Sequence, residues 1–413
     1  MLGPLEFRPI EVFVALVAAS AVVGLIARRV AVPYTVALVV FGLAAAFFLP
    51  KMDFAIAEDL VLVVLLPGLI FEASYHLDLG ELRRSFGGVA LLAIPGVLLT
   101  ALVVAGLLTV VAGVDFSLGF VVGSIVAATD PAAVIATFKR VGAPRRLATL
   151  IEGESLFNDG TALVVFAIAQ RAVTGQVTTA DATFTFLTTV LISLVIGSAI
   201  GYVASWMIAT VDDHLLELTV SLAAAYGAYL IADIFHESGI IATVVAGIVF
   251  GNYGRGHGMS ERTQEALDTV WEFLAFLLTA LVFLLVGLVI TLPDMAHSLG
   301  PILVGVVGIL IGRALVVYLL VGGTSRLISD RFHPGVPTGW LHVMFWSGLR
   351  GAVAVAMALS LPIDFPQRGL LQEITFGVVL FTLLVQGTTT DLVLDRVGVS
   401  RDRTPPPPVP EGA

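Results

Sequence analysis

Two acidic motifs lie inside otherwise apolar stretches of this chain. The first contains Thr129 and Asp130, and the second contains Ser155, Asn158 and Asp159. An ionisable residue within a membrane span is costly unless it is paired or hydrated, so it marks a functional site by default. Hydroxyl, amide and carboxylate oxygens are the hard ligands that a dehydrated Na⁺ or K⁺ needs. The two motifs therefore predict a site for a monovalent cation.

The first motif also contains Pro131, directly after Asp130. Proline removes one backbone donor and disfavours helical geometry at the residue before it, so the helix should break around Thr129–Pro131. The freed backbone groups must face protein or a wet cavity, because lipid cannot satisfy them. Asp130 would compensate the positive end of the following half-helix. A plain proline kink with a capping aspartate is the simpler interpretation, and the two are compatible.

The second motif places its polar side chains on two neighbouring helix faces. Four-residue spacing aligns Ser155 with Asp159, and Glu154 with Asn158. A carboxylate there can also bind a proton, because desolvation favours its neutral form. One group that binds either a cation or a proton, never both, is sufficient for obligatory exchange. The alternative is a polar helix end in water, but Asp159 lies too far into the span for that, at ~1.5 Å of rise per residue.

Three further charges occur in apolar segments. Glu72 lies near the end of one predicted span, where it could line an ion access funnel or be an interfacial acid without a role. Arg313 is deep in another span and requires a carboxylate partner. Arg350 stands between Gly348 and Gly351, a pattern that predicts an unwound stretch.

Composition identifies the elements that must position these residues. The chain of 413 residues is 58% hydrophobic and 13% charged, where soluble domains carry about 25% charged residues. A membrane helix needs about 20 mostly apolar residues. By that rule we predict an all-α polytopic membrane protein with about 13 transmembrane helices, near residues 10–27, 32–49, 57–75, 87–111, 116–138, 148–170, 183–209, 214–234, 238–253, 267–291, 298–322, 339–361 and 374–394.

The basic residues predict the orientation. Of the 21 Lys and Arg residues, 15 follow odd-numbered spans and four lie on the other side; Arg313 and Arg350 fall inside spans. Basic loops stay in the cytoplasm, so we expect the N-terminus outside and the C-terminus inside, in the cell membrane. We expect one membrane domain over residues 1–397 and a disordered, proline-rich tail over 398–413.

The two interrupted spans occupy corresponding places. The fifth span is the middle one of spans 4–6 (residues 87–170), and the twelfth is the middle one of spans 11–13 (residues 298–394). The trios are separated by an odd number of spans, so they cross the membrane in opposite senses. Inverted repeats with paired broken helices are typical of secondary transporters.

At these residues the chain resembles a known family. The motifs are Ala-Thr-Asp130-Pro-Ala-Ala-Val, Gly153-Glu-Ser-Leu-Phe-Asn158-Asp159-Gly-Thr-Ala, His236-Glu-Ser238-Gly239-Ile-Ile-Ala and Gly348-Leu-Arg350-Gly-Ala-Val. They are similar to those of the sodium/proton exchangers of the NhaP and NHE type, within the monovalent cation:proton antiporters. The resemblance spans helices 3 to 12.

The resemblance implies a role for each of these residues. Asp159 would be the shared cation and proton site, with Ser155, Thr129 and Glu72 as further ligands. The other roles are structural: Asp130 and Asn158 would hold two crossed helices together, Glu154 would pair with Arg313, and Arg350 would neutralise carbonyl ends at the second break. Asn158 before Asp159 resembles the electroneutral members, which exchange one cation for one proton. The family implies a homodimer in which the two trios form a mobile core against a scaffold of the remaining helices.

The expected function is therefore exchange of Na⁺, or Li⁺, for H⁺ by alternating access. A K⁺/H⁺ antiporter with the same mechanism stays open, because relatives with these motifs differ in their ion. A cation channel is a remote alternative. We expect no cofactor, no nucleic-acid partner and no enzymatic activity, since the chain has no HExxH motif and no cysteine. The expected partners are membrane lipids and a second copy of the chain.

Overall fold

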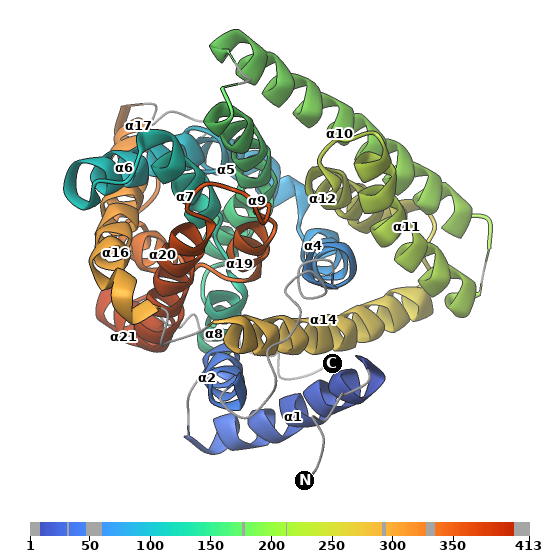
Figure 1. Ribbon diagram of the computed structural model, residues 1–413. Helices are drawn as coiled ribbons and strands as arrows, with labels where there is room; N and C mark the ends of the chain where they lie inside the picture. The colour runs from blue at the N-terminus through green and yellow to red at the C-terminus, as the bar shows by residue number, and fades with distance from the viewer. Residues whose placement is uncertain are drawn as a thin grey trace.

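The structure is a computed structural model that describes residues 9–30, 33–46, 60–175, 178–211, 213–290, 295–327 and 335–399. Every regular element in these ranges is a helix, and no strand occurs in them (Figure 1). The prediction of an all-α fold is therefore confirmed. Of the tail that we predict to be disordered (398–413), residues 400–413 lie outside these ranges.

Apolar helices of membrane-spanning length dominate the described part of the chain. Seven are long and apolar enough to cross a membrane, and four shorter apolar helices accompany them. Parts of the predicted spans 32–49 and 57–75 lie outside the described residues, so the count of 13 stays a prediction.

Several helices extend beyond the apolar stretches that predicted them. The predicted span 267–291 overlaps α14 (Glu261–Val289), which begins before it, and the predicted span 148–170 lies within α9 (Arg145–Val173). Hydropathy detects only the apolar length of a helix, whereas the helix continues until a cap ends it. Ser260 caps α14 by accepting the N–H of Thr263, and Asp78 caps α5 by accepting two N–H groups. The helix of the fourth span likewise begins before the predicted span, at Leu79 rather than at residue 87.

The first trio consists of α5 (Leu79–Ala93) and α6 (Pro95–Ala112), then α7 (Phe116–Ala127) and α8 (Ala132–Val141), then α9. Pro95 separates α5 from α6 because it cannot continue the hydrogen-bond ladder. The predicted break of the fifth span is present: residues 128–131 are not helical.

The second trio has the same three-part order. Its elements are η3 (Ala296–Ser298), α16 (Leu299–Ala314), η4 (Leu315–Val321) and α17 (Gly322–Leu327); α18 (Thr338–Trp346) and α19 (Ala352–Leu359); and α20 (Arg368–Phe381), η5 (Thr382–Gly387) and α21 (Thr388–Val397). The predicted break of the twelfth span is also present, at residues 347–351. The π-helical segments η4 and η5 are wider turns, which recur at functional sites.

The two trios pack against each other on one side of the molecule, where α6 contacts α7 and α16, and α20 contacts α7 (Figure 1). The other side holds α10 (Thr179–Ile208), α11 (His214–Ile234) and α12 (Gly239–Val249), continued by η2 (Phe250–Gly254) and α13 (Arg255–His257). Between them lies α4 (Leu66–Tyr75), which follows η1 (Leu60–Leu65) and contacts both α9 and α12. The division into a mobile core and a scaffold stays a prediction.

The remaining helices, α1 (Pro9–Val30) and α2 (Tyr34–Ala46), pack against α14. Glycine allows the closest of these contacts. A Cβ atom on Gly42 would lie 2.5 Å from the carbonyl oxygen of Leu284, and one on Gly287 would lie 2.3 Å from that of Val39. Small residues at helix crossings let backbones approach closely, as is common in membrane proteins.

Candidate functional site

The two helix breaks meet in the middle of the two trios. The N–H of Asp130, in the break between α7 and α8, donates to the carbonyl oxygen of Leu349 at 2.9 Å. Leu349 lies in the break between α18 and α19. One backbone group of each break is thus satisfied by the other break, since lipid offers no water to satisfy it.

The Asp130 carboxylate caps both half-helices that follow the breaks. Its Oδ1 accepts the N–H of Ala132, the first residue of α8, at 3.0 Å. The carboxylate also accepts the N–H of Ala352, the first residue of α19. A negative charge at a helix N-terminus is favourable. Gly351 permits this approach, because a Cβ atom there would lie 2.0 Å from Oδ2 of Asp130.

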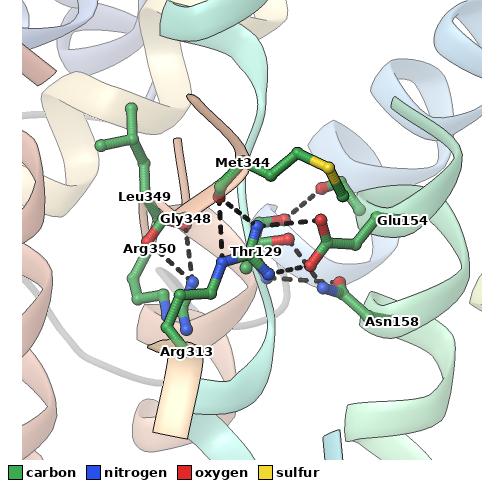
Figure 2. A network of polar contacts seen from close by, with 9 residues as sticks. Thr129, Glu154, Asn158, Arg313, Met344, Gly348, Leu349 and Arg350 are labelled. Atoms are coloured by element: carbon green, nitrogen blue, oxygen red, sulfur yellow. Dashed lines mark hydrogen bonds and ion pairs between the residues drawn. The ribbon is translucent and has the colours of Figure 1, made fainter. Parts of the chain in front are cut away.

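Helix α9 supplies the partners of Thr129. The Ser155 hydroxyl donates to the carbonyl oxygen of Thr129. Asn158 donates to the Thr129 hydroxyl at 2.7 Å and accepts the Thr129 N–H at 3.3 Å. Figure 2 shows Asn158 reaching from α9 to Thr129. The structure therefore brings three of the predicted site residues into direct contact, all of them buried.

Asp159 is the residue after Asn158 within α9, and it is 8% exposed. In the described part of the chain its Oδ1 has no hydrogen-bond partner. Its negative charge is repelled by that of Asp130 and attracted by the positive charge of Arg350. A buried carboxylate without a direct partner is unfavourable unless a cation or a proton neutralises it. The oxygens of Thr129, Ser155 and Asp159 are those that could hold a monovalent cation here.

Glu154 and Arg313 form the buried ion pair that the resemblance implied. Their side chains are 3% and 6% exposed. Both terminal nitrogens of Arg313 reach the carboxylate, one of them at 2.9 Å (Figure 2). Arg313 also donates to the carbonyl oxygen of Met344 from Nε at 3.1 Å and from Nη2 at 2.7 Å. Met344 lies in the last turn of α18, so the guanidinium compensates the negative end of that half-helix.

Arg350 is 1% exposed and lies within the second break. Its Nη1 donates to the carbonyl oxygen of Gly348 at 2.8 Å (Figure 2). Its backbone N–H donates to the hydroxyl of Thr382 at 3.0 Å. The guanidinium thus contacts a free carbonyl of the break, which is the arrangement that the resemblance implied.

Glu72 stands apart from this group. Its carboxylate lies 3.3 Å from Nδ1 of His76, one turn further along the chain, and its side chain is 20% exposed. The second ring nitrogen of His76 lies 3.5 Å from Asp268 on α14. The structure brings Glu72 to the end of α4. A role in an access funnel and an interfacial position both stay open, and its role as a cation ligand stays a prediction.

Sequence reasoning missed four participants: the carbonyl groups of Met344 and Leu349, the hydroxyl of Thr382, and the close approach of Gly351 to Asp130. No sequence signal marks a carbonyl, because every residue has one. Thr382 is a single hydroxyl in an apolar run, which is unremarkable in a membrane helix. A glycine beside Arg350 indicated unwinding but not its partner.

The amino-acid sequence matches one family model and known antiporters over most of its length. The family model described as "Sodium/hydrogen exchanger, transmembrane" matches residues 15–396. The chain is 36% identical over 376 residues to the Na⁺/H⁺ antiporter ApNhaP of Aphanothece halophytica, covering 90% of this chain and 71% of that protein. It is 37% identical over 359 residues to the Na⁺/H⁺ antiporter NhaP of Pseudomonas aeruginosa, covering 84% and 82%.

A solved structure shares the fold. The sodium proton antiporter MjNhaP1 from Methanocaldococcus jannaschii superposes with a TM-score of 0.76 at 20% identity, covering 94% of this chain and 98% of that one. The family match covers nearly the whole chain, including both helix breaks and the buried acidic group. This protein is a multi-pass membrane protein that belongs to the sodium/hydrogen exchanger family.

Proposed function

We propose that this protein is an antiporter that exchanges one Na⁺ for one H⁺, with the two ions competing for Asp159. The observation that carries the proposal is the environment of this carboxylate. Asp159 is buried, one of its oxygens has no hydrogen-bond partner in the described residues, and it adjoins a break whose oxygens are held in place by α9. Either ion would neutralise it, and neither can bind while the other is present.

The charges around the breaks support a stoichiometry of one to one. Three carboxylates and two guanidinium groups lie there: Asp130, Glu154, Asp159, Arg313 and Arg350. Glu154 and Arg313 balance each other, and Arg350 offsets one of the two aspartates. One negative charge is left, and buried charge is tolerated only when it is compensated. A single Na⁺ or a single H⁺ supplies that compensation.

The names of the relatives support Na⁺ as the transported ion, since both are described as Na⁺/H⁺ antiporters. Li⁺ would bind the same oxygen ligands. We further propose that the chain works as a transporter without enzymatic activity and without a cofactor. Alternating access would expose the site to one side of the membrane at a time, with Asp130 and Arg350 keeping the breaks neutral throughout.

We also propose a homodimer in the cell membrane, with the N-terminus outside. The bias of basic residues toward the loops after odd-numbered spans supports the orientation. Helix α10 supports an extended contact with lipid or with a second copy, because only 17% of its most apolar window is buried within the chain.

The test is ion exchange in proteoliposomes with an internal pH dye. Added Na⁺ or Li⁺ should drive proton efflux in the wild type, and K⁺ serves as the arm that tests the alternative ion. Asp159→Asn should abolish the exchange while the protein stays folded, since the amide can bind neither ion by charge. Asp364→Asn is the matched control, because Asp364 is exposed, and it should exchange like the wild type. Exchange by Asp159→Asn at near the wild-type rate would refute the assignment.

A further inference from the structure

One peptide group connects the two breaks to the last helix of the second trio. The carbonyl of Leu349 accepts the N–H of Asp130 at 2.9 Å. The N–H of the same peptide unit, that of Arg350, donates to Oγ1 of Thr382 at 3.0 Å. A peptide unit is planar, so an acceptor for its N–H also fixes the direction of its carbonyl. The orientation of the acceptor for Asp130 is therefore set from Thr382.

Thr382 is suited to hold that group in one orientation. It is 1% exposed and is the first residue of the π-helical segment η5. Its hydroxyl donates to the carbonyl oxygen of Val379 at 2.9 Å, within its own helix. Since that donation fixes the hydroxyl hydrogen, a lone pair of Oγ1 faces the N–H of Arg350.

We propose that Thr382 is a positioning residue for the ion site. It holds the Leu349–Arg350 peptide group so that the carbonyl of Leu349 receives the Asp130 N–H. Asp130 in turn interacts electrostatically with Asp159. The hydroxyl of Thr382 thus acts on the site through two backbone hydrogen bonds, without touching the ion.

The first trio contains the same arrangement. There the N–H of Thr129, in the break between α7 and α8, donates to Oδ1 of Asn158 on α9 at 3.3 Å. In each trio, a polar side chain of the third helix accepts a free N–H from the break in the second. Thr382 corresponds to Asn158 in this respect, and both act on the same pair of breaks.

Loss of the hydroxyl would leave the Arg350 N–H buried without an acceptor. The Leu349–Arg350 peptide would then rotate to find another partner, and Asp130 would lose its own acceptor with it. This predicts a weaker ion site, and its role in transport rests on the proposed exchange at Asp159.

The first test compares three variants in proteoliposomes. Thr382→Val keeps the shape and removes the hydroxyl, and it should raise the apparent KM for Na⁺ by about tenfold, the effect of one lost buried hydrogen bond. Thr382→Ser keeps the hydroxyl and should restore the wild-type KM. Thr375→Val is the matched control on the same buried helix, because the Thr375 hydroxyl has no hydrogen-bond partner in the described residues. It should leave the KM unchanged.

The second test is amide hydrogen exchange of the purified protein, which needs no transport. In the wild type, a peptide covering residues 347–351 should be protected. Thr382→Val, or Thr382→Ala should the valine variant not fold, should speed exchange there more than in α16, which carries no such contact. Thr382→Ser should keep the protection.

Three results would overturn the inference: fast exchange of this peptide in the wild type, an unchanged KM in Thr382→Val, or a serine variant that behaves like the valine one. A wild type that exchanges no Na⁺ would instead contradict the proposed function, while the hydrogen-exchange result would still decide the position of Thr382.

Discussion

The buried pair of Glu154 and Arg313 provides the sharpest test of how the site is held together. Arg313→Ala leaves the Glu154 carboxylate, which is 3% exposed, without its partner. It also removes both donors from the Met344 carbonyl. Breaking a buried ion pair by removing one partner typically costs about 3–5 kcal/mol.

The exposed pair of Arg140 and Asp391 is the matched control. Its side chains are 61% and 48% exposed, and exposed pairs contribute about 0–1 kcal/mol. At ~2 °C per kcal/mol, the lower end of the range for domains of 150–250 residues, Arg313→Ala should lower the unfolding temperature by about 6–10 °C. On the same scale, Arg140→Ala should lower it by at most about 2 °C.

The assay is thermal unfolding in detergent or nanodiscs, followed by tryptophan fluorescence. Glu154→Gln should also destabilise, because it leaves the guanidinium buried without a counter-charge. The double variant Glu154→Gln with Arg313→Met should lose less than the sum of the two single variants, since neither charge is then stranded. Single variants that melt like the wild type, or a double variant that is strictly additive, would refute a coupled pair.

Three further predictions concern charge, packing and pH. With one Na⁺ exchanged per proton, a valinomycin-clamped potential should leave the exchange rate nearly unchanged. A transporter that moves one net charge per cycle would instead experience a driving force of about 2.3 kcal/mol per 100 mV. Strong voltage dependence of the rate would exclude one-to-one exchange. Gly351→Ala should reduce exchange severely, because its Cβ would meet the Asp130 carboxylate. Gly369 has open space around it, so Gly369→Ala should exchange like the wild type. An active Gly351→Ala protein would contradict the capping role of Asp130. Burial lowers the pKa of His76, but the hydrogen bond and charge of Glu72, with the charge of Asp268, outweigh it and raise that pKa above its ordinary 6.5. The stabilisation by this pairing is therefore fully present below pH 6.5 and is lost as the pH rises through the folded-state pKa. The difference in unfolding temperature between the wild type and His76→Gln should accordingly shrink between pH 6 and pH 9. A constant difference would show that His76 does not titrate in this range.

The charged residues around the two breaks were easy to find in the sequence, because membrane helices make polar residues conspicuous. Asp130, Glu154, Asp159, Arg313 and Arg350 were all identifiable as charges in apolar stretches. In lipid such charges are costly, so each one implied a partner or a function. Pro131 likewise implied the break at residues 128–131, since proline cannot donate a backbone hydrogen bond.

Helix ends were less predictable. The starts of α5 and α14 depend on Asp78 and Ser260, which accept backbone N–H groups outside the apolar stretch. Hydropathy carries no information about such caps. The break at residues 347–351 was indicated only by two glycines and a serine, which are compatible with an intact helix as well.

The sequence by itself determined that the chain lies in a membrane, that its fold is all-α, and which buried charges must be compensated. These properties depend on residue type and on spacing along one helix. What only the tertiary structure decided is which groups are in contact; the residues by themselves required a partner for Arg313, and only the family resemblance suggested Glu154. Glu154 and Arg313 lie 159 positions apart, and Arg350 and Thr382 lie 32 apart. The acceptors for Arg313 and for the Asp130 N–H are carbonyl groups, which every residue possesses. Only the packing of the two trios brings these groups within hydrogen-bond distance. A hydrogen bond acts over about 3 Å, and the spacing of two residues along the chain does not indicate whether folding brings them that close.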